Sequence, residues 1–284
     1  MQSIRKINFQ GLEIGGEENI LESKPIFALE LNIFDFDASS HIVKDYYNYE
    51  TGQNFDAVKL LNIAQKSACD IIALKFNIPE ENLEENINAA KVLLKELLPH
   101  IKKPLMIRGV NNKTVDSKLL PSLTEVLDRE CIIAFAEETT YRAIVPFCVK
   151  GGHILVIRTP IDINLAKEMN ILTSDMGLSL DKILIDTDMG GLGYGLEYGY
   201  SIMERIKLAA FDGDKMLNMP LIAFAGEEAL KAKEAKSDSF DAGYGDFKLR
   251  SKMYEITTAS AVIASGANIV VLENPESIDV LKRI

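Results

Sequence analysis

The stretch KILIDTDMGGLGYGLEYGYSIMERIKLAAF, residues 182–211, contains the structural unit that repeats along this chain. It starts with a short apolar run that resembles a buried strand, and it ends with the apolar spacing of a helix. Between them, five glycines fall within residues 190–199. Because an ordered glycine costs roughly 0.5–1 kcal/mol relative to alanine, this loop predicts positive φ angles or a close approach of backbone to another group. A tight turn that merely packs is the alternative.

Seven more apolar runs without polar alternation occur along the chain, each followed by a helical pattern. They lie at 25–33, 70–76, 104–109, 131–137, 153–159, 220–226 and 268–274. Such runs are typical of parallel strands that are buried on both faces. Eight strand–helix units in about 260 residues predict a closed (β/α)8 TIM barrel, with residues 1–284 as a single domain and an N-terminal hairpin within residues 1–20. An open doubly wound sheet is the alternative, although no GxGxxG follows the first strand.

Two connections are longer than simple turns, and we expect both on the C-terminal face of the barrel. They span residues 34–54 and 237–248, and their aromatic residues are Phe34, Phe36, Tyr46, Tyr47 and Tyr49 in the first and Phe240, Tyr244 and Phe247 in the second. Long loops in compact domains are usually functional, and aromatic residues are enriched in interfaces. We therefore predict that both loops contact partner proteins; surface insertion without a role is the alternative.

Helix starts are marked at two places. Thr159 reads as an N-cap followed by Pro160, with Asp162 as its capping-box acid, and Asn274 precedes Pro275 in the same way.

The composition excludes several classes of function. Apolar residues make up 47% of the chain and the net charge is −11, without a Lys/Arg cluster, so nucleic acid and anionic membranes are disfavoured as partners. No apolar run reaches the ~20 residues of a membrane span. The three cysteines Cys69, Cys131 and Cys148 are predicted to be buried free thiols in a reducing cytoplasm. No CxxC, HExxH or DxHxxG occurs, so we expect no metal ligand set and no cofactor bound by this chain alone.

The runs RTPIDINLAKEMNIL and GGLGYGLEYGYSIMERIKLAAFDGDKMLNMP resemble the small (delta) subunit of the corrinoid iron–sulfur protein of the acetyl-CoA decarbonylase/synthase complex. The resemblance covers about residues 20–284 and is strongest over 136–236. It implies a TIM barrel paired with a large subunit that carries a [4Fe–4S] cluster and cobalamin. It also implies that the pair receives a methyl group from methyltetrahydrofolate through a methyltransferase and passes it to acetyl-CoA synthase/CO dehydrogenase in the Wood–Ljungdahl pathway.

The resemblance implies a non-catalytic subunit whose barrel face caps the partner's cobalamin domain. The candidate contacts lie after the fourth and sixth strands and are Glu137, Asp186, Asp188, Gly190, Gly191, Gly193 and Tyr194. No catalytic or metal-binding residue is expected. Glu204, Arg205 and Lys207 are predicted to lie on the solvated or inter-subunit face of the helix that follows. The chain departs from the family at Thr187, where many relatives have proline, and in the segment GVNNKTVDSKLL, so a paralogue that serves another corrinoid protein stays open.

Two other functions remain as alternatives. A pterin-dependent corrinoid methyltransferase on a related barrel would bind methyltetrahydrofolate itself. An aldolase or another metabolic barrel enzyme is disfavoured, because no Schiff-base lysine or metal cluster is visible at the strand ends. Carboxylates at the strand ends could act in acid–base chemistry, but no histidine or lysine is visible beside them in the sequence.

Overall fold

A computed structural model describes residues 2–54 and 56–283 and contains a closed barrel of eight parallel strands. Around the barrel the strands follow the order β10-β3-β4-β5-β6-β7-β8-β9, so sequence neighbours are also neighbours in space. The strands are β3 (Ile26–Asn32), β4 (Ile71–Lys75), β5 (Leu105–Arg108), β6 (Ile132–Ala136), β7 (Ile154–Arg158), β8 (Ile183–Asp186), β9 (Leu221–Ala223) and β10 (Ile269–Leu272). The predicted TIM barrel is confirmed.

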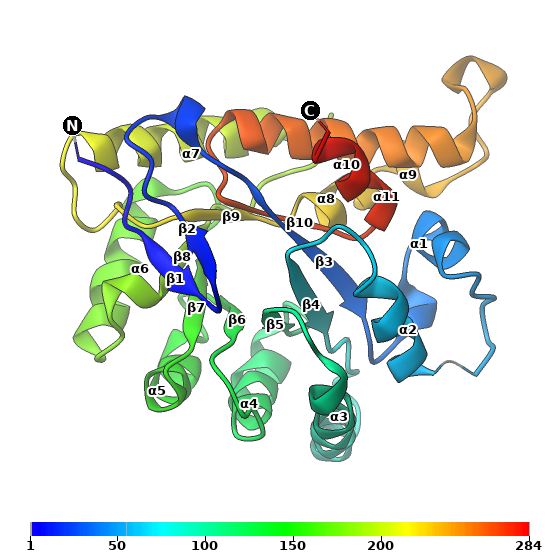
Figure 1. The fold of residues 1–284 in the computed structure, drawn as a ribbon, viewed down its shortest axis with the longest axis horizontal. Helices are drawn as coiled ribbons and strands as arrows, with labels where there is room; N and C mark the ends of the chain where they lie inside the picture. The colour runs from blue at the N-terminus through cyan, green and yellow to red at the C-terminus, as the bar shows by residue number, and fades with distance from the viewer. Residues whose placement is uncertain (1, 55, 284) are drawn as a thin grey trace.

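Helices surround the barrel on its outside (Figure 1). They are α1 (His41–Tyr46), α2 (Ala57–Ala64), α3 (Leu83–Leu97), α4 (Lys113–Thr124), α5 (Tyr141–Gly151), α6 (Ile163–Asp175), α7 (Leu196–Phe211), α8 (Ala225–Lys231), α9 (Lys233–Lys236), α10 (Phe247–Ala264) and α11 (Pro275–Leu281). Five 3-10 turns complete the elements: η1 (Ile20–Glu22), η2 (Phe36–Ala38), η3 (Leu98–His100), η4 (Leu180–Lys182) and η5 (Ala242–Tyr244). None of the described helices is long and apolar enough to cross a membrane.

The predicted N-terminal hairpin closes the barrel at the end where the strands begin. Its strands β1 (Ile7–Phe9) and β2 (Leu12–Ile14) pair antiparallel across a turn at Gln10 and Gly11, both at positive φ. Ile7, Phe9 and Ile14 are buried in one cluster with the apolar side chains of the barrel lumen. The hairpin is therefore an apolar plug.

A buried polar contact joins the segment after the hairpin to the barrel wall, and it corrects one prediction. Lys207 is fully buried; its ammonium donates to Glu17 and, at 2.7 Å, to the side-chain oxygen of Asn268. The prediction of a solvated or inter-subunit Lys207 is wrong. Its ammonium group donates to two acceptors within the protein instead of to water. Arg205 is exposed, as predicted.

The predicted start of α6 is also wrong by three residues, whereas that of α11 is confirmed. Asp162 is the N-cap of α6 and accepts from the backbone N–H groups of Asn164 and Leu165. Thr159 is buried behind it. At α11, Asn274 is the N-cap and Pro275 is the first helical residue.

Candidate functional site at the barrel mouth

The C-terminal end of the barrel, called the mouth below, is lined by charged side chains from the strand ends. Glu30 on β3, Arg108 at the end of β5 and Arg158 at the end of β7 are each at most 4% exposed. Lys75 and Asp186 end β4 and β8. Side chains alternate along a strand, so residues two positions apart face the same side. These charged side chains therefore face the lumen, in line with the apolar residues of the lumen cluster that precede them on each strand.

One half of the mouth is organised by Arg108. Its guanidinium donates to the Glu30 carboxylate at 2.6 Å and also pairs with Glu227, the third residue of α8. Lys75 lies 3.3 Å from the same Glu227 carboxylate. Burial alone would raise the pKa of Glu227, but the two cations hold that pKa well below its ordinary value. This carboxylate is therefore ionised at neutral pH.

The other half is organised by Arg158. Its Nε donates to Asp186 at 2.6 Å, and its NH1 lies 3.3 Å from Asp188. Asp186 is fully buried, so its carboxylate pairs with Arg158 and is not exposed at the rim. Asp188, with a side chain 35% exposed and φ of 49°, stands at the surface.

Two phenylalanine rings separate these charged halves. The guanidinium carbon of Arg158 lies 3.4 Å from the centroid of Phe135, and that of Arg108 lies 4.5 Å from the centroid of Phe224. The rings meet edge to face with centroids 5.5 Å apart. Both arginines thus stack on aromatic faces, a favourable contact for a desolvated cation. All four side chains are at most 3% exposed, so they close the mouth.

The structure brings together three of the predicted site residues around Arg158. Glu137 is half-buried, and burial raises its pKa; Arg158 opposes the shift, while Asp188 and Asp186 add to it. These carboxylates therefore share one neighbourhood. Among residues 2–54 and 56–283, no group of three or more His, Cys, Asp or Glu side chains is arranged to hold a metal ion.

The glycine-rich loop after β8 divides into two parts. A Cβ on Gly190 would collide with the backbone carbonyl of Tyr194, and one on Gly191 would lie 2.5 Å from the carbonyl oxygen of Glu228. The close approach predicted from the glycines is thus made to the chain's own backbone at these two positions. By contrast, Gly193 has φ of 78° with open space around its Cβ position.

Tyr194 follows at the rim and is half-exposed. Its hydroxyl donates to Glu234 on α9 at 3.1 Å. The glycine-rich loop is thereby tied to the segment that leads to α10, while about half of the Tyr194 surface stays exposed to solvent.

The two long loops meet each other, and three of their eight aromatic residues are buried in the chain's own core. The His41 ring contacts Phe247, and Lys248 pairs with Asp45 at 2.6 Å. In the first loop the aromatics belong to the core: Phe36, Tyr47 and Tyr49 are buried, and Phe34 and Tyr46 are packed against that core. The buried rings of Phe36, Tyr47 and Tyr49 are therefore not available to a partner, and contact between this loop and a partner protein stays a prediction. In the second loop Tyr244 is exposed and Phe240 and Phe247 are partly buried.

The charged layer at the mouth was missed in the sequence, although a signal exists. Glu30, Lys75 and Arg108 each interrupt or end an otherwise apolar strand run. A lone charge in such a run predicts a lumen-facing ion pair. Glu227, which completes the layer, stands in a helix and has no such signal.

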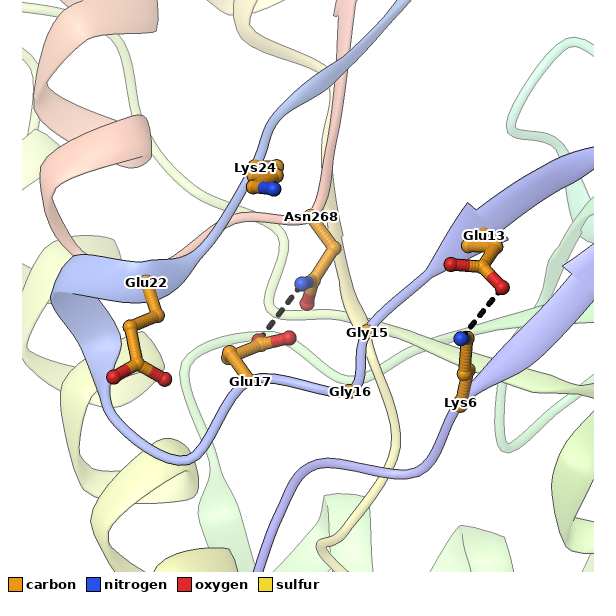
Figure 2. Close-up of a pocket in the computed structure, with 8 residues that line it drawn as sticks. All are labelled: Lys6, Glu13, Gly15, Gly16, Glu17, Glu22, Lys24 and Asn268. Atoms are coloured by element: carbon orange, nitrogen blue, oxygen red, sulfur yellow. Dashed lines mark hydrogen bonds and ion pairs between the residues drawn. The ribbon is translucent and has the colours of Figure 1, made fainter.

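A cavity of about 460 Å³ lies at the opposite end, beside the hairpin (Figure 2). Its lining mixes both charges: Lys6 pairs with Glu13, and Glu17 accepts from Asn268. These charged and polar side chains pair with one another within the chain. We therefore interpret the cavity as a polar gap where the hairpin segment meets the barrel.

The sequence matches the family described as "CO dehydrogenase/acetyl-CoA synthase delta subunit" over residues 11–281. It is 33% identical over 203 residues to the acetyl-CoA decarbonylase/synthase complex subunit delta 1 of Methanosarcina thermophila, covering 69% of this chain and 46% of that protein. It is 31% identical over 198 residues to the subunit delta of Methanocaldococcus jannaschii, covering 69% and 48%. The chain thus spans about half the length of these relatives.

Solved structures with the same fold include dihydropteroate synthases. That of Xanthomonas albilineans with 4-aminobenzoic acid has a TM-score of 0.64 at 9% identity, covering 99% of this chain and 97% of the other. That of Yersinia pestis with a pterine-sulfa conjugate has a TM-score of 0.57 at 11% identity, covering 98% of each. At such identities the likeness is one of fold.

Proposed function

Because this chain belongs to the family of the CO dehydrogenase/acetyl-CoA synthase delta subunit, we propose that it is a non-catalytic docking subunit of a methyl-carrying corrinoid complex. Its rim receives the cobalamin domain of a large subunit that also holds a [4Fe–4S] cluster. The assembled pair carries a methyl group from a methyltetrahydrofolate methyltransferase to acetyl-CoA synthase in the Wood–Ljungdahl pathway.

The observation that carries this proposal is the closed mouth. Enzymes on this fold bind their substrates among the loops at the C-terminal ends of the strands. Here Arg108, Arg158, Phe135 and Phe224 fill that place, and the two guanidinium groups pair with carboxylates and stack on the two rings. A filled mouth offers a broad surface to a protein domain and little depth to a small substrate.

Three rim groups are suited to a corrin ring that is edged with amides. Glu137 and Asp188 offer carboxylate acceptors, and Gly193 offers bare backbone in open space. The half-exposed Tyr194 ring adds an apolar surface beside them. Corrinoid chemistry itself belongs to the partner's cofactor when it is bound.

Coexpression with the large corrinoid subunit tests this function. We expect the two to copurify, and we expect Tyr194→Ala to weaken the association of the corrinoid domain while Tyr194→Phe retains it. Val92→Ala, on the exposed face of α3 and far along the barrel wall, is the matched control. Copurification with no effect of Tyr194→Ala would place the docking site elsewhere.

The alternative is a pterin-dependent corrinoid methyltransferase. Titration of the isolated chain with methyltetrahydrofolate separates the two, since a methyltransferase must bind that substrate itself. The filled mouth favours the docking subunit. Saturable binding of methyltetrahydrofolate by the lone chain would support the alternative.

A further inference from the structure

The three cysteines of the chain are buried free thiols, as predicted, but their surroundings differ. Burial raises the pKa of Cys131 and of Cys148 to about 12, so both thiols stay protonated at neutral pH. At Cys69 the ammonium group of Lys103 lies 3.5 Å from the sulfur. A neighbouring ammonium favours the thiolate, which is the form of cysteine that reacts. Cys69 is therefore the thiol of this chain that is best placed to react.

Backbone carbonyls hold Lys103 against this sulfur. Its Nζ also donates to the carbonyl oxygen of Ser67 at 2.9 Å and to that of Cys69 at 2.6 Å. Together with the sulfur, these acceptors use the three N–H bonds of the ammonium group. Two of the three acceptors are neutral carbonyls, so the positive charge remains to stabilise a thiolate. Cys69 lies just before β4 and Lys103 just before β5, so the pair joins the starts of two neighbouring strands.

A second polar group near the sulfur has no partner. Tyr47 is 6% exposed, and its hydroxyl has no hydrogen-bond partner among the residues that the structure describes. Burial raises the pKa of this hydroxyl, and charge on Cys69 adds to the shift, so the hydroxyl lies within electrostatic reach of the sulfur. A buried donor without an acceptor costs about 1–3 kcal/mol. An oxygen atom added to the sulfur would supply that acceptor.

We propose that Cys69 is a modification site, oxidised by hydrogen peroxide to a sulfenate that Lys103 and Tyr47 stabilise. The thiolate attacks one peroxide oxygen, so an S–O bond forms, the O–O bond breaks and hydroxide leaves. The hydroxide takes the proton of the new S–OH group and becomes water. Sulfur is oxidised by two electrons and the peroxide is reduced by two. The Lys103 ammonium and the Tyr47 hydroxyl then donate to the sulfenate oxygen.

The position of the pair suits a small oxidant. Hydrogen peroxide is little larger than water, and Lys103 is partly exposed, so this oxidant can approach from solvent. Cys69 and Lys103 stand where β4 and β5 begin, at the end of the barrel opposite to the mouth. This inference therefore does not rest on the proposed docking function.

Peptide mass spectrometry of the full chain tests the site. The chain is treated with peroxide, the excess is removed with catalase, and the chain is then unfolded in dimedone, which traps sulfenic acids. Because labelling takes place in the unfolded chain, burial does not bias it. The three cysteines fall on separate tryptic peptides, residues 67–75, 130–142 and 143–150. We expect the dimedone adduct on Cys69 and none on Cys131 or Cys148.

Two variants separate the roles of the neighbours. Lys103→Met should slow formation of the adduct about tenfold, because loss of the cation lowers the thiolate fraction. Lys102→Met removes the exposed neighbouring lysine and should react like the wild type. Tyr47→Phe keeps the ring in the core. It should leave the rate of oxidation unchanged and shorten the life of the sulfenate, measured by delaying the dimedone after catalase.

Several outcomes overturn the proposal. Equal labelling of the three cysteines does so, and so does a chain without any adduct on Cys69. This comparison within the wild type needs no variant, so it stays decisive if Lys103→Met folds poorly. An oxidation rate in folded Lys103→Met equal to that of the wild type overturns the proposal as well. An unchanged sulfenate lifetime in Tyr47→Phe overturns the role given to that hydroxyl.

Discussion

The two ends of the barrel are both closed, but by opposite kinds of side chain. At the hairpin end, Ile7, Phe9 and Ile14 continue the apolar lumen. At the mouth, Arg108 and Arg158 are buried with carboxylates around two phenylalanine rings. The hairpin end is closed by burial of apolar area, whose benefit depends little on geometry or pH.

A buried ion pair is different, because desolvation of the charges offsets most of their attraction. Apolar side chains of similar size would close the mouth at least as stably. The charged layer is therefore weak evidence for stability. It gives the mouth a fixed geometry and polar rim groups, which accords with a role in docking.

The largest expected effect comes from breaking one ion pair. Arg158→Met leaves Asp186 buried without its partner and should cost about 3–5 kcal/mol of unfolding free energy near pH 7. The loss should shrink in acid, where Asp186 becomes protonated. Phe9→Ala at the hairpin end should cost a similar ~3–5 kcal/mol, with no such dependence on pH. Denaturant melts at two pH values measure both.

The double variant Arg158→Met/Asp186→Leu is the control for that experiment. It removes both charges and should recover most of the lost stability, as apolar replacements of buried pairs do elsewhere. If the double variant is as unstable as the single one, Arg158 matters through its stacking on Phe135 and the charge comparison fails.

The next largest effect concerns a buried carboxyl behind the mouth. Glu255 of α10 accepts from the backbone N–H groups of Glu273 and Asn274, just after β10, and burial raises its pKa to about 7. When the pKa of a carboxyl is higher in the folded state than in the unfolded state, its contribution to stability is fully present at low pH. That stability is lost as pH rises from about 4 through 7, by about 3 kcal/mol in all.

Glu255→Gln tests this loss. The amide oxygen keeps the acceptor role and carries no charge, so the variant should be more stable than wild type at pH 8. At pH 4 the two should be alike. Thermal melts across this range measure the difference, and parallel curves for the two proteins would contradict the assignment.

Much of the fold was predictable because each strand of a parallel barrel is buried on both faces. The eight apolar runs match the eight strands, and the run at 182–187 contains β8. Lys207 shows the limit. Its position along the helix predicted exposure to solvent. Its partners Glu17 and Asn268 lie 190 and 61 residues away in the sequence, and no local pattern indicates such a contact.

The glycine-rich loop shows a second limit of the same kind. Its sequence predicts close approach but not the group approached. For Gly191 that group is the carbonyl of Glu228, a residue brought near only by closure of the barrel. The candidate residues Glu137, Asp186 and Asp188 could be placed at strand ends, whereas their shared partner Arg158 required the fold.

Gly191→Ala should therefore act on folding first. Its Cβ would lie 2.5 Å from the Glu228 carbonyl oxygen, and overpacking against backbone should cost about 2 kcal/mol. Gly193→Ala meets only open space at φ of 78° and should cost about 1 kcal/mol through backbone strain. Thermal unfolding of the two lone chains measures the difference. Equal losses would mean that the loop relaxes away from α8.

The smallest effect compares one strained residue at each end of the barrel. Ile161, after β7 at the mouth, has φ of 46° and is 40% exposed; Gln10, in the hairpin turn, has φ of 47°. A β-branched residue is rare in this conformation, whereas asparagine tolerates it. Ile161→Asn relieves backbone strain but loses some apolar contact. The net effect should be a gain of about 0.5–1 kcal/mol in unfolding free energy. Gln10→Asn should gain a similar small amount from the turn preference.

The two variants then separate strain from docking. Ile161 is an apolar residue in a strained conformation at an exposed rim, and such strain clusters at functional sites. Ile161→Asn should therefore weaken association with the large corrinoid subunit while the lone chain melts at a slightly higher temperature. Gln10→Asn should leave that association unchanged, because the hairpin closes the far end. If both variants bind the partner like wild type, Ile161 is only a strained turn residue, and the difference between the two ends does not extend to docking at this loop.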